Sequence, residues 1–404
     1  MEVAYGRAGS RFRSTLTQSS LAFAFNLGGL AAGFFASFAF QSINRAIFLV
    51  LLPAILTVRG DIGGILSGRL GTALHTGRIV PSLRRNTAEF YSLLRGIFVL
   101  TFLEMAAVGL MAYPLSAATL KVDVKDLYLY VLLPSLTGCS SAVISIPLTS
   151  ILAILTFRKG LDPDVIVYPA MSMINDIVII IIYFGIAWIL LLKGGVSIIV
   201  GFLTFFFLVA TSTFFFIRGK GERTFSSVLR EGFPVVLFCG LIGTLSGVLL
   251  GGMKKILERR PSVLILYPTL LGTLGGMGSI IGSTTTTRLH LGELPPHAAT
   301  LKKVSASILA AEAASGPMHV LYGAGAFLLA SKVMLLNAQL DKLILASILT
   351  NLLSFLPICL FSFLVAIITF RKGFDPDNFV IPIETSVSDA LGTLSLFIAA
   401  SIVY

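Results

Sequence analysis

Runs of apolar residues recur along the whole chain, and polar residues gather in the short segments between them. Each run has about 20 residues or more, the length that an α-helix needs to cross roughly 30 Å of hydrocarbon. The expected fold class is therefore an all-α polytopic membrane protein, whose longer helices tilt, bend or continue into the interface. The pattern predicts eleven membrane-spanning helices, near residues 20–41, 44–74, 90–114, 127–156, 163–192, 196–217, 227–252, 261–288, 301–331, 338–370 and 376–403.

Composition supports this class. Of the 404 residues, 56% are hydrophobic and 12% are charged, and the mean hydropathy is +0.94, whereas about a quarter of the residues in soluble proteins are charged. Cys139, Cys239 and Cys359 lie inside apolar runs without metal-type spacing, so we expect them to be small packing residues. The basic N-terminal segment precedes an apolar run longer than that of a typical signal peptide, and we interpret this run as the first membrane helix.

The net charge of +11 would suggest a nucleic-acid partner in a soluble protein. Here most basic residues lie in connections between apolar runs, where topology and contact with anionic lipids explain them without nucleic acid. If the N-terminus is cytoplasmic, 19 Lys and Arg residues fall on the cytoplasmic side and 10 on the other, with Arg59 unassigned because it is mid-span. We therefore expect a cell-membrane protein with a cytoplasmic N-terminus and an external C-terminus. One connection predicted to be external opposes the rule that basic residues gather on the cytoplasmic side, since it carries Lys254, Lys255, Arg259 and Arg260.

Two stretches are written twice, which marks an internal duplication. FRKGLDPDVIVYPAMSMIND at 157–176 returns as FRKGFDPDNFVIPIETSVSD at 370–389, and residues 51–77 match 266–292 at a shift of 215. We expect a first five-helix repeat in residues 1–193, a linker helix and cytoplasmic loop in 194–226, and a second five-helix repeat in 227–404. Because one extra helix separates them, both repeats should face the same way across the membrane.

Each copy of the first stretch carries an aspartate, Asp176 or Asp389, into an apolar run. Asp176 follows the expected helix start at Asp162 by 14 residues, which is roughly 21 Å along a helix. A charge at that depth costs about 2.5–3.5 kcal/mol on insertion scales, so it should face a partner or a wet cavity. Pro169 and Pro382 should interrupt these helices and free a carbonyl. Two carboxylates suit one Mg²⁺ ion, which keeps most of its water when bound. The alternative role for these aspartates is a structural ion pair with a buried basic residue such as Arg69 or Arg288.

Other polar residues in apolar runs are candidates for lining a pathway. The matched stretch at 51–77 and 266–292 combines proline, glycine and hydroxyl residues, which favours either tight helix packing or a pathway wall with freed carbonyls. Glu104 and Glu312 match at a shift of 208 and could equally serve packing, and Asp61 could pair with Arg59. Glu384 stands where the first repeat has Met171, so any site is asymmetric. The candidates are Asp61, Glu104, Glu312, Glu384, Ser283 and Thr284.

The doubled Asp-Pro-Asp followed by proline and an intramembrane aspartate, together with the SGRLGTALHTG end of the second run, resembles the MgtE-type magnesium transporters. The chain is most similar to the fused two-repeat form found among the eukaryotic solute-carrier magnesium transporters. The resemblance implies a central metal site between the repeats to which Asp176 and Asp389 contribute. The sequence departs from the family pattern at Gly60-Asp61 and Gly275-Gly276, where the family often has Gly-Asn.

These features predict transport of a divalent cation, most simply Mg²⁺, by a single chain that acts as a pseudo-dimer among membrane lipids, with no organic cofactor. The sequence contains no GxxxxGK[ST] phosphate-binding loop, so transport driven directly by ATP is not expected. An inside-negative membrane potential favours the entry of a divalent ion by about 4.6 kcal/mol per 100 mV. The alternatives are a sodium- or proton-coupled exchanger or exporter, an intramembrane enzyme acting on lipid, and a membrane scaffold. The histidines and carboxylates form no hydrolase or transferase motif.

Overall fold

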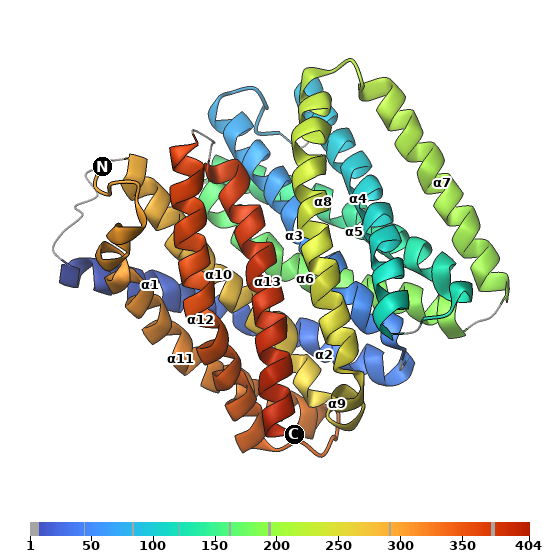
Figure 1. Ribbon diagram of the computed structural model, residues 1–404. Helices are drawn as coiled ribbons and strands as arrows, with labels where there is room; N and C mark the ends of the chain where they lie inside the picture. The colour runs from blue at the N-terminus through green and yellow to red at the C-terminus, as the bar shows by residue number, and fades with distance from the viewer. Residues whose placement is uncertain are drawn as a thin grey trace. The chain divides into compact units, whose positions relative to one another are not determined.

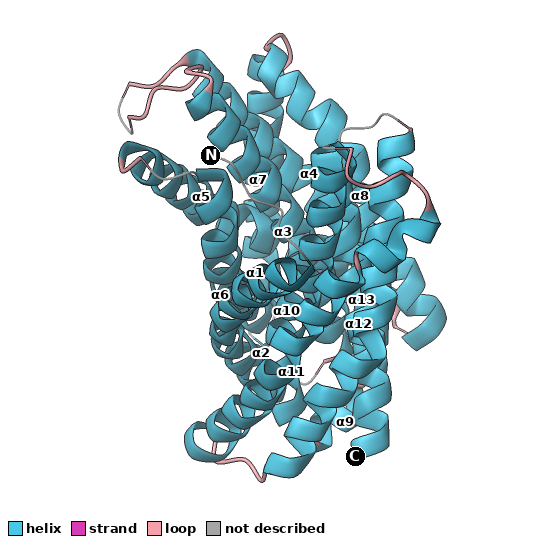
Figure 2. Cartoon of the chain, turned by 90° about the vertical axis from the view of Figure 1, so that its left-hand side faces the viewer, coloured by secondary structure: helices cyan, strands magenta, loops and turns pink. Residues whose placement is uncertain are grey.

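The computed structural model describes residues 8–43, 45–82, 85–120, 122–160, 163–192, 195–290, 292–372 and 376–404. Every regular element in these residues is helical, which confirms the all-α polytopic fold class (Figure 2). Ten helical stretches in the described part of the chain are long and apolar enough to cross a membrane. The predicted span 301–331 is a long helix as well, but its composition is more polar than that of the other ten.

One compact unit consists of Ser42–Gly252. Its central helix is α3, which packs against α4, α5, α6 and α8, while α7 covers α4 and α5. Helix α7 turns large apolar side chains outward, for example Phe207, which is 68% exposed, as expected for a surface that faces lipid. The unit contains α3 (Ala46–His75), α4 (Ala88–Leu120), η2 (Val124–Asp126), α5 (Leu127–Arg158), α6 (Pro163–Leu192), α7 (Gly195–Gly219) and α8 (Arg223–Gly252).

The other compact unit combines the described residues up to Gln41 with Met253–Tyr404. Its central helix is α10, which packs against α11, α12 and α13, while α1 packs along α11 (Figure 1). The unit contains α1 (Ala8–Phe25), η1 (Asn26–Gly28), α2 (Gly29–Ile43), α9 (Lys254–Arg259), α10 (Ser262–His290), η3 (Ala298–Lys303), α11 (Ser305–Leu328), η4 (Leu329–Val333), α12 (Leu340–Arg371) and α13 (Pro376–Val403).

Close glycine contacts explain which helices pack together in each unit. A methyl group added at Gly247 of α8 would collide with the Val50 carbonyl of α3, and one added at Gly33 of α2 would collide with the Ile265 carbonyl of α10. Val50 and Ile265 are related by the same shift of 215 that relates the duplicated stretches. Glycine lets two backbones approach closely enough for such packing in a membrane. The two units therefore use equivalent glycine contacts to hold their central helices.

The prolines inside the spans do not break their helices. Helix α3 continues through Pro53, α10 through Pro268, and α6 and α13 through Pro169 and Pro382. The prediction that Pro169 and Pro382 interrupt their helices is therefore wrong, because both helices are continuous. Proline removes one backbone donor, but neighbouring helices and hydroxyl side chains can satisfy the freed groups inside a bundle.

Candidate functional site

Arg59 is a charged partner of Asp176 in the unit Ser42–Gly252. Its side chain is 3% exposed and donates from Nη2 to Ser145 Oγ on α5. The charges of Arg59 and Asp176 attract each other across the contact between α3 and α6. Gly63 of α3 lies beside both helices' polar side chains, because a Cβ there would be in ordinary contact with Arg59 Nη1 at 3.4 Å and with Asn175 Nδ2 at 3.7 Å.

The expected alternative partners, Arg69 and Arg288, are engaged elsewhere. Arg69 pairs with Glu231 at 3.1 Å and donates to Ser227 Oγ, while Arg288 lies 3.4 Å from Glu293. Arg69 is ten residues beyond Arg59, which places it roughly 15 Å further along α3. The prediction of an ion pair between Asp176 and Arg69 is therefore wrong. The arginine that interacts with Asp176 is Arg59.

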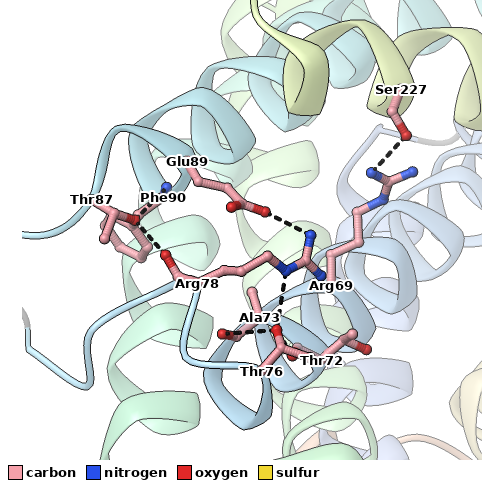
Figure 3. Close-up of polar contacts among 9 residues, drawn as sticks. All are labelled: Arg69, Thr72, Ala73, Thr76, Arg78, Thr87, Glu89, Phe90 and Ser227. Atoms are coloured by element: carbon pink, nitrogen blue, oxygen red, sulfur yellow. Dashed lines mark hydrogen bonds and ion pairs between the residues drawn. The ribbon is translucent and has the colours of Figure 1, made fainter.

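Polar contacts bind the Arg69 end of α3 to its surroundings (Figure 3). Arg78 pairs with Glu89 at 3.0 Å and also donates to Thr76 Oγ1. The helix ends at His75, and two residues later Gly77 has a φ of +69°, a left-handed conformation that suits glycine. Gly292 has a φ of +71° at the equivalent end of α10. Both central helices thus finish with the same kind of cap.

Asp61 and Glu104 bring two more carboxyl groups into this unit. Asp61 is 6% exposed and Glu104 is fully buried, and their charges repel across α3 and α4. Neither Glu104 oxygen has a hydrogen-bond partner among the described residues. Arg59 and Asp61 are two positions apart, so their side chains leave α3 on different sides. Arg59 thus reaches toward α6 and α5, whereas Asp61 interacts with α4.

Asp389 occupies the equivalent position on α13. Its charge acts on Tyr267 of α10, whose hydroxyl lies 3.0 Å from Thr393 Oγ1. Thr393 in turn donates a 2.7 Å hydrogen bond to the Asp389 carbonyl. The surroundings of the two aspartates therefore differ, because Leu274 stands where the first half has Arg59.

Glu384 is fully buried five residues before Asp389 on α13. Its Oε1 and the Ser362 hydroxyl both lie against Gly278, where an added methyl group would collide with them. Gly278 is one of the glycines in the duplicated stretch of α10, so here its small size accommodates a buried carboxyl group. The half that has the additional glutamate thus also has, at Gly278, the space that its carboxyl group occupies.

Glu312 is held in a hydrogen-bonded chain that sequence reasoning missed. Asn351 of α12 donates to Glu312 Oε1 at 2.8 Å, Ser315 donates to Asn351 Oδ1 at 2.9 Å, and His319 Nδ1 lies 3.1 Å from Ser315 Oγ. His319 is fully buried. The signal was available, because asparagine and histidine are unusual inside apolar runs. The corresponding first-half residues are Ala107, Met111 and Gly138, so this chain exists in one half only.

Ser283 and Thr284 are not joined to these carboxyl groups. Ser283 is exposed and donates at 2.6 Å to the Ser279 carbonyl of its own helix, and Thr284 is half-buried. The matched glycines Gly60 and Gly275 face open space, since a Cβ at either would meet no atom within 4 Å. Glycine at these two positions is therefore not explained by tight helix packing.

Several predicted features lie outside the described residues. Asp162 and Asp375 are among the residues left undescribed, and the same holds for the side chains of Asp164, Asp377 and Pro169. Helices α6 and α13 begin at Pro163 and Pro376, as their sequences predict. Within the described ranges, no group of three or more His, Cys, Asp or Glu side chains is arranged to hold a metal ion.

A helical bundle with carboxyl groups buried in membrane-spanning helices defines a polytopic membrane protein of the transporter class. The profile of the MgtE family, described as a divalent cation transporter, matches residues 52–186 and 267–399. The chain belongs to the MgtE family of divalent cation transporters. This membership places it among transporters rather than enzymes, so the alternative of an enzyme acting on lipid does not hold.

Relatives cover most of the chain. It is 25% identical over 381 residues to solute carrier family 41 member 2 of Mus musculus and 26% identical over 390 residues to that of Xenopus laevis, covering 86% and 89% of this chain. The chain spans 62% and 66% of the lengths of those relatives. A solved multidrug resistance transporter of the MATE family, in an inward-facing conformation, aligns over 98% of each chain with 13% identity and a TM-score of 0.35.

Proposed function

We propose that the chain transports Mg²⁺ across the cell membrane through a site to which Asp176 and Asp389 both contribute a carboxylate. The observation that carries this proposal is the double family match, because each matched segment contains one of these aspartates at the corresponding position. One chain then supplies both carboxylates, so it can act as a monomeric pseudo-dimer. Mg²⁺ keeps several waters and is usually bound through one or two carboxylates.

The buried polar residues extend this proposal to the path. Asp61 and Glu104 place two more carboxyl groups in the unit that contains Asp176, and Glu384 places one on α13, the helix that carries Asp389. Gly60 and Gly275 leave open space on the two central helices. Carboxyl groups at such depth normally face a partner or water-filled space. Ser283 and Thr284 remain candidates only for the outer part of the path, since no described contact joins them to the carboxyl groups.

Direction and coupling follow from the driving force. A negative interior alone would draw a divalent cation inward by about 4.6 kcal/mol per 100 mV, so uptake needs no second ion. Export would require exchange for Na⁺ or H⁺. The predicted orientation, with a cytoplasmic N-terminus, assigns the DPD segments before α6 and α13 to the cytoplasmic side.

Flux into proteoliposomes tests the proposal. Initial Mg²⁺ uptake is measured with a lumenal dye under a membrane potential, a Na⁺ gradient or a pH gradient, for the parent and for Asp176→Asn combined with Asp389→Asn. We expect uptake by the parent and a loss of about tenfold or more in the double variant, since each change removes a charge-assisted contact of about 1.5–3 kcal/mol. Asp341→Asn, at the exposed start of α12, is the matched control.

The outcomes separate the two parts of the proposal. Unchanged flux in the double variant would reject the site while leaving Mg²⁺ transport intact. Absence of Mg²⁺ flux in the parent under every gradient would reject magnesium as the cargo. A strict requirement for a Na⁺ or pH gradient would identify an exchanger instead of a channel.

A further inference from the structure

A basic cavity lies at one end of the unit that contains α9 to α13. Its volume is about 540 Å³, and its lining includes Lys255, Arg259, Arg260, Asn337 and Tyr404. Helix α9 lies beside the C-terminal end of α13 in both views (Figures 1 and 2). Lys255, Arg259 and Arg260 come from the connection whose positive charge opposed the predicted topology, and the proposed transport site does not use them.

The cations of this cavity have no ion-pair partner among the described residues. Among the described residues, no carboxylate lies within 4.0 Å of Lys255, Arg259 or Arg260. Their neighbour Lys254, which does not line the cavity, pairs with Glu258 at 3.4 Å. Clustered positive charges repel one another, so three uncompensated cations around one cavity favour an anionic occupant.

Two side chains fix part of this geometry. Arg260 donates from Nη1 to the Asn337 carbonyl at 3.3 Å, and its guanidinium lies 5.6 Å from the centre of the Tyr404 ring. The Tyr404 hydroxyl is buried without a hydrogen-bond partner among the described residues. Burial raises the pKa of Tyr404 to about 12, so at neutral pH its hydroxyl keeps the proton and can donate it to an anion. Arginine donors suit a phosphate group especially well.

The cavity also lies where a lipid headgroup would be found. The span of α10 begins at Ser262, that of α12 begins at Leu340, and that of α13 ends at Val403, all beside the cavity lining. The segment that supplies Asn337 exposes apolar side chains nearby, with Leu335 83% exposed. Apolar groups this exposed next to cations match a phospholipid, whose acyl chains adjoin its phosphate.

We propose that this cavity binds the phosphate group of an anionic phospholipid. The three cations and the Tyr404 hydroxyl take up the phosphate, and the exposed side chain of Leu335 lies against the acyl region. A bound anionic lipid also accounts for basic residues on the side that the charge rule predicts to be external.

Native mass spectrometry of the detergent-purified full chain tests this site. Phosphatidylglycerol and phosphatidylcholine with the same acyl chains are titrated against the parent and against Lys255→Gln combined with Arg259→Gln. Both side chains are exposed, so these changes should not affect folding. We expect the parent to prefer phosphatidylglycerol and the variant to bind it about tenfold more weakly, equivalent to about 1.4 kcal/mol. Binding of phosphatidylcholine should not change.

Two controls remove positive charge outside the cavity. Lys254→Gln alters the neighbouring residue outside the cavity, and Arg371→Gln combined with Lys372→Gln removes two charges at the opposite end of α12. Both should keep the parent's phosphatidylglycerol affinity. Equal loss in either control, or no loss in the Lys255 and Arg259 variant, would overturn the proposal. Inorganic phosphate that raises the parent's Tm as much as phosphatidylglycerol would also overturn it, because the ligand would then be a soluble ion.

Discussion

A single residue, Arg59, gives the two halves different electrostatic characters. It is buried on the central helix of its unit, interacts with Asp176 and donates to Ser145. At the matching position the other half has Leu274, which is also buried. A divalent ion at Asp176 must therefore compete with a resident cation, whereas Asp389 has no arginine at the matching position of its own central helix.

Replacing Arg59 with leucine should strengthen the binding of Mg²⁺. The change copies the second half and removes a positive charge that offsets Asp176, so the Mg²⁺ concentration for half-maximal thermal stabilisation should fall by about fivefold, equivalent to roughly 1 kcal/mol. A Mg²⁺ titration followed by thermal unfolding measures this shift. Arg69→Leu, ten residues along the same helix and paired with Glu231, should leave the titration unchanged. Weaker Mg²⁺ binding in Arg59→Leu would show that the arginine supports the ion instead.

At the scale of elements, side-chain hydrogen bonds join α11 to α12 in one half only. Asn351 bridges Glu312 and Ser315, and Ser315 continues to His319. In the other half the position of Asn351 is Gly138, whose missing side chain instead gives room to Met105. The same helix pair is thus held by polar contacts in one half and by close apolar packing in the other.

Asn351→Ala should destabilise the protein because it leaves Glu312 and Ser315 without their bridging partner. Each buried polar group that loses its partner costs about 1–3 kcal/mol, and the expected fall in Tm is about 2–6 °C. Thermal unfolding in detergent measures it. Thr350→Val is the control, because the Thr350 hydroxyl bonds only to the Ala346 carbonyl of its own helix. A fall as large in Thr350→Val as in Asn351→Ala would mean that the bridge contributes nothing.

The connection between α7 and α8 is joined to α4 by an ion pair between Glu222, which lies between two spans, and Arg95 of α4. Arg95 donates from Nη2 to Glu222 at 2.6 Å, and the Ser92 hydroxyl and the Arg95 guanidinium lower the pKa of Glu222 below its ordinary value. A depressed pKa stabilises the fold above the ordinary pKa of glutamate, and this contribution disappears as the pH falls through the folded-state pKa.

Glu222→Gln should therefore lower the Tm at neutral pH and have no effect in acid. The expected fall is small, about 1–3 °C, because the pair is partly exposed. Thermal unfolding across a pH series compares the variant with the parent. Arg95→Gln should give a similar fall, and the two changes together should cost less than their sum. A deficit that persists at low pH would point to packing as the cause.

The long apolar runs allowed the helices to be predicted, because length and hydropathy are local properties of the sequence. Local breaks were harder to predict: the first span divides at η1 (Asn26–Gly28), and the basic connection folds into the short helix α9. The deep positions of Asp176 and Asp389 could be inferred from their place in apolar runs. Their partners could not, because Arg59 and Arg69 lie on one helix and only the packing of α3 on α6 selects Arg59.

For the whole molecule, these differences predict that the two aspartates are unequal in transport. Removing the carboxylate of Asp176 leaves Arg59 as an uncompensated cation facing the site, which repels a divalent ion. Removing the carboxylate of Asp389 creates no such unpaired cation on α10, because Leu274 stands at the position that matches Arg59. Both expectations rest on the proposed Mg²⁺ site.

Asp176→Asn should therefore slow Mg²⁺ uptake more than Asp389→Asn, by about tenfold if the residual repulsion is worth about 1.4 kcal/mol. Adding Arg59→Leu to Asp176→Asn should then restore uptake toward the Asp389→Asn rate, since it removes the cation that the first change left unpaired. Initial rates in proteoliposomes at one Mg²⁺ concentration compare the three variants, with Arg69→Leu added to Asp176→Asn as the matched control. Equal rates for the single variants, or no recovery with Arg59→Leu, would place Arg59 away from the ion's path.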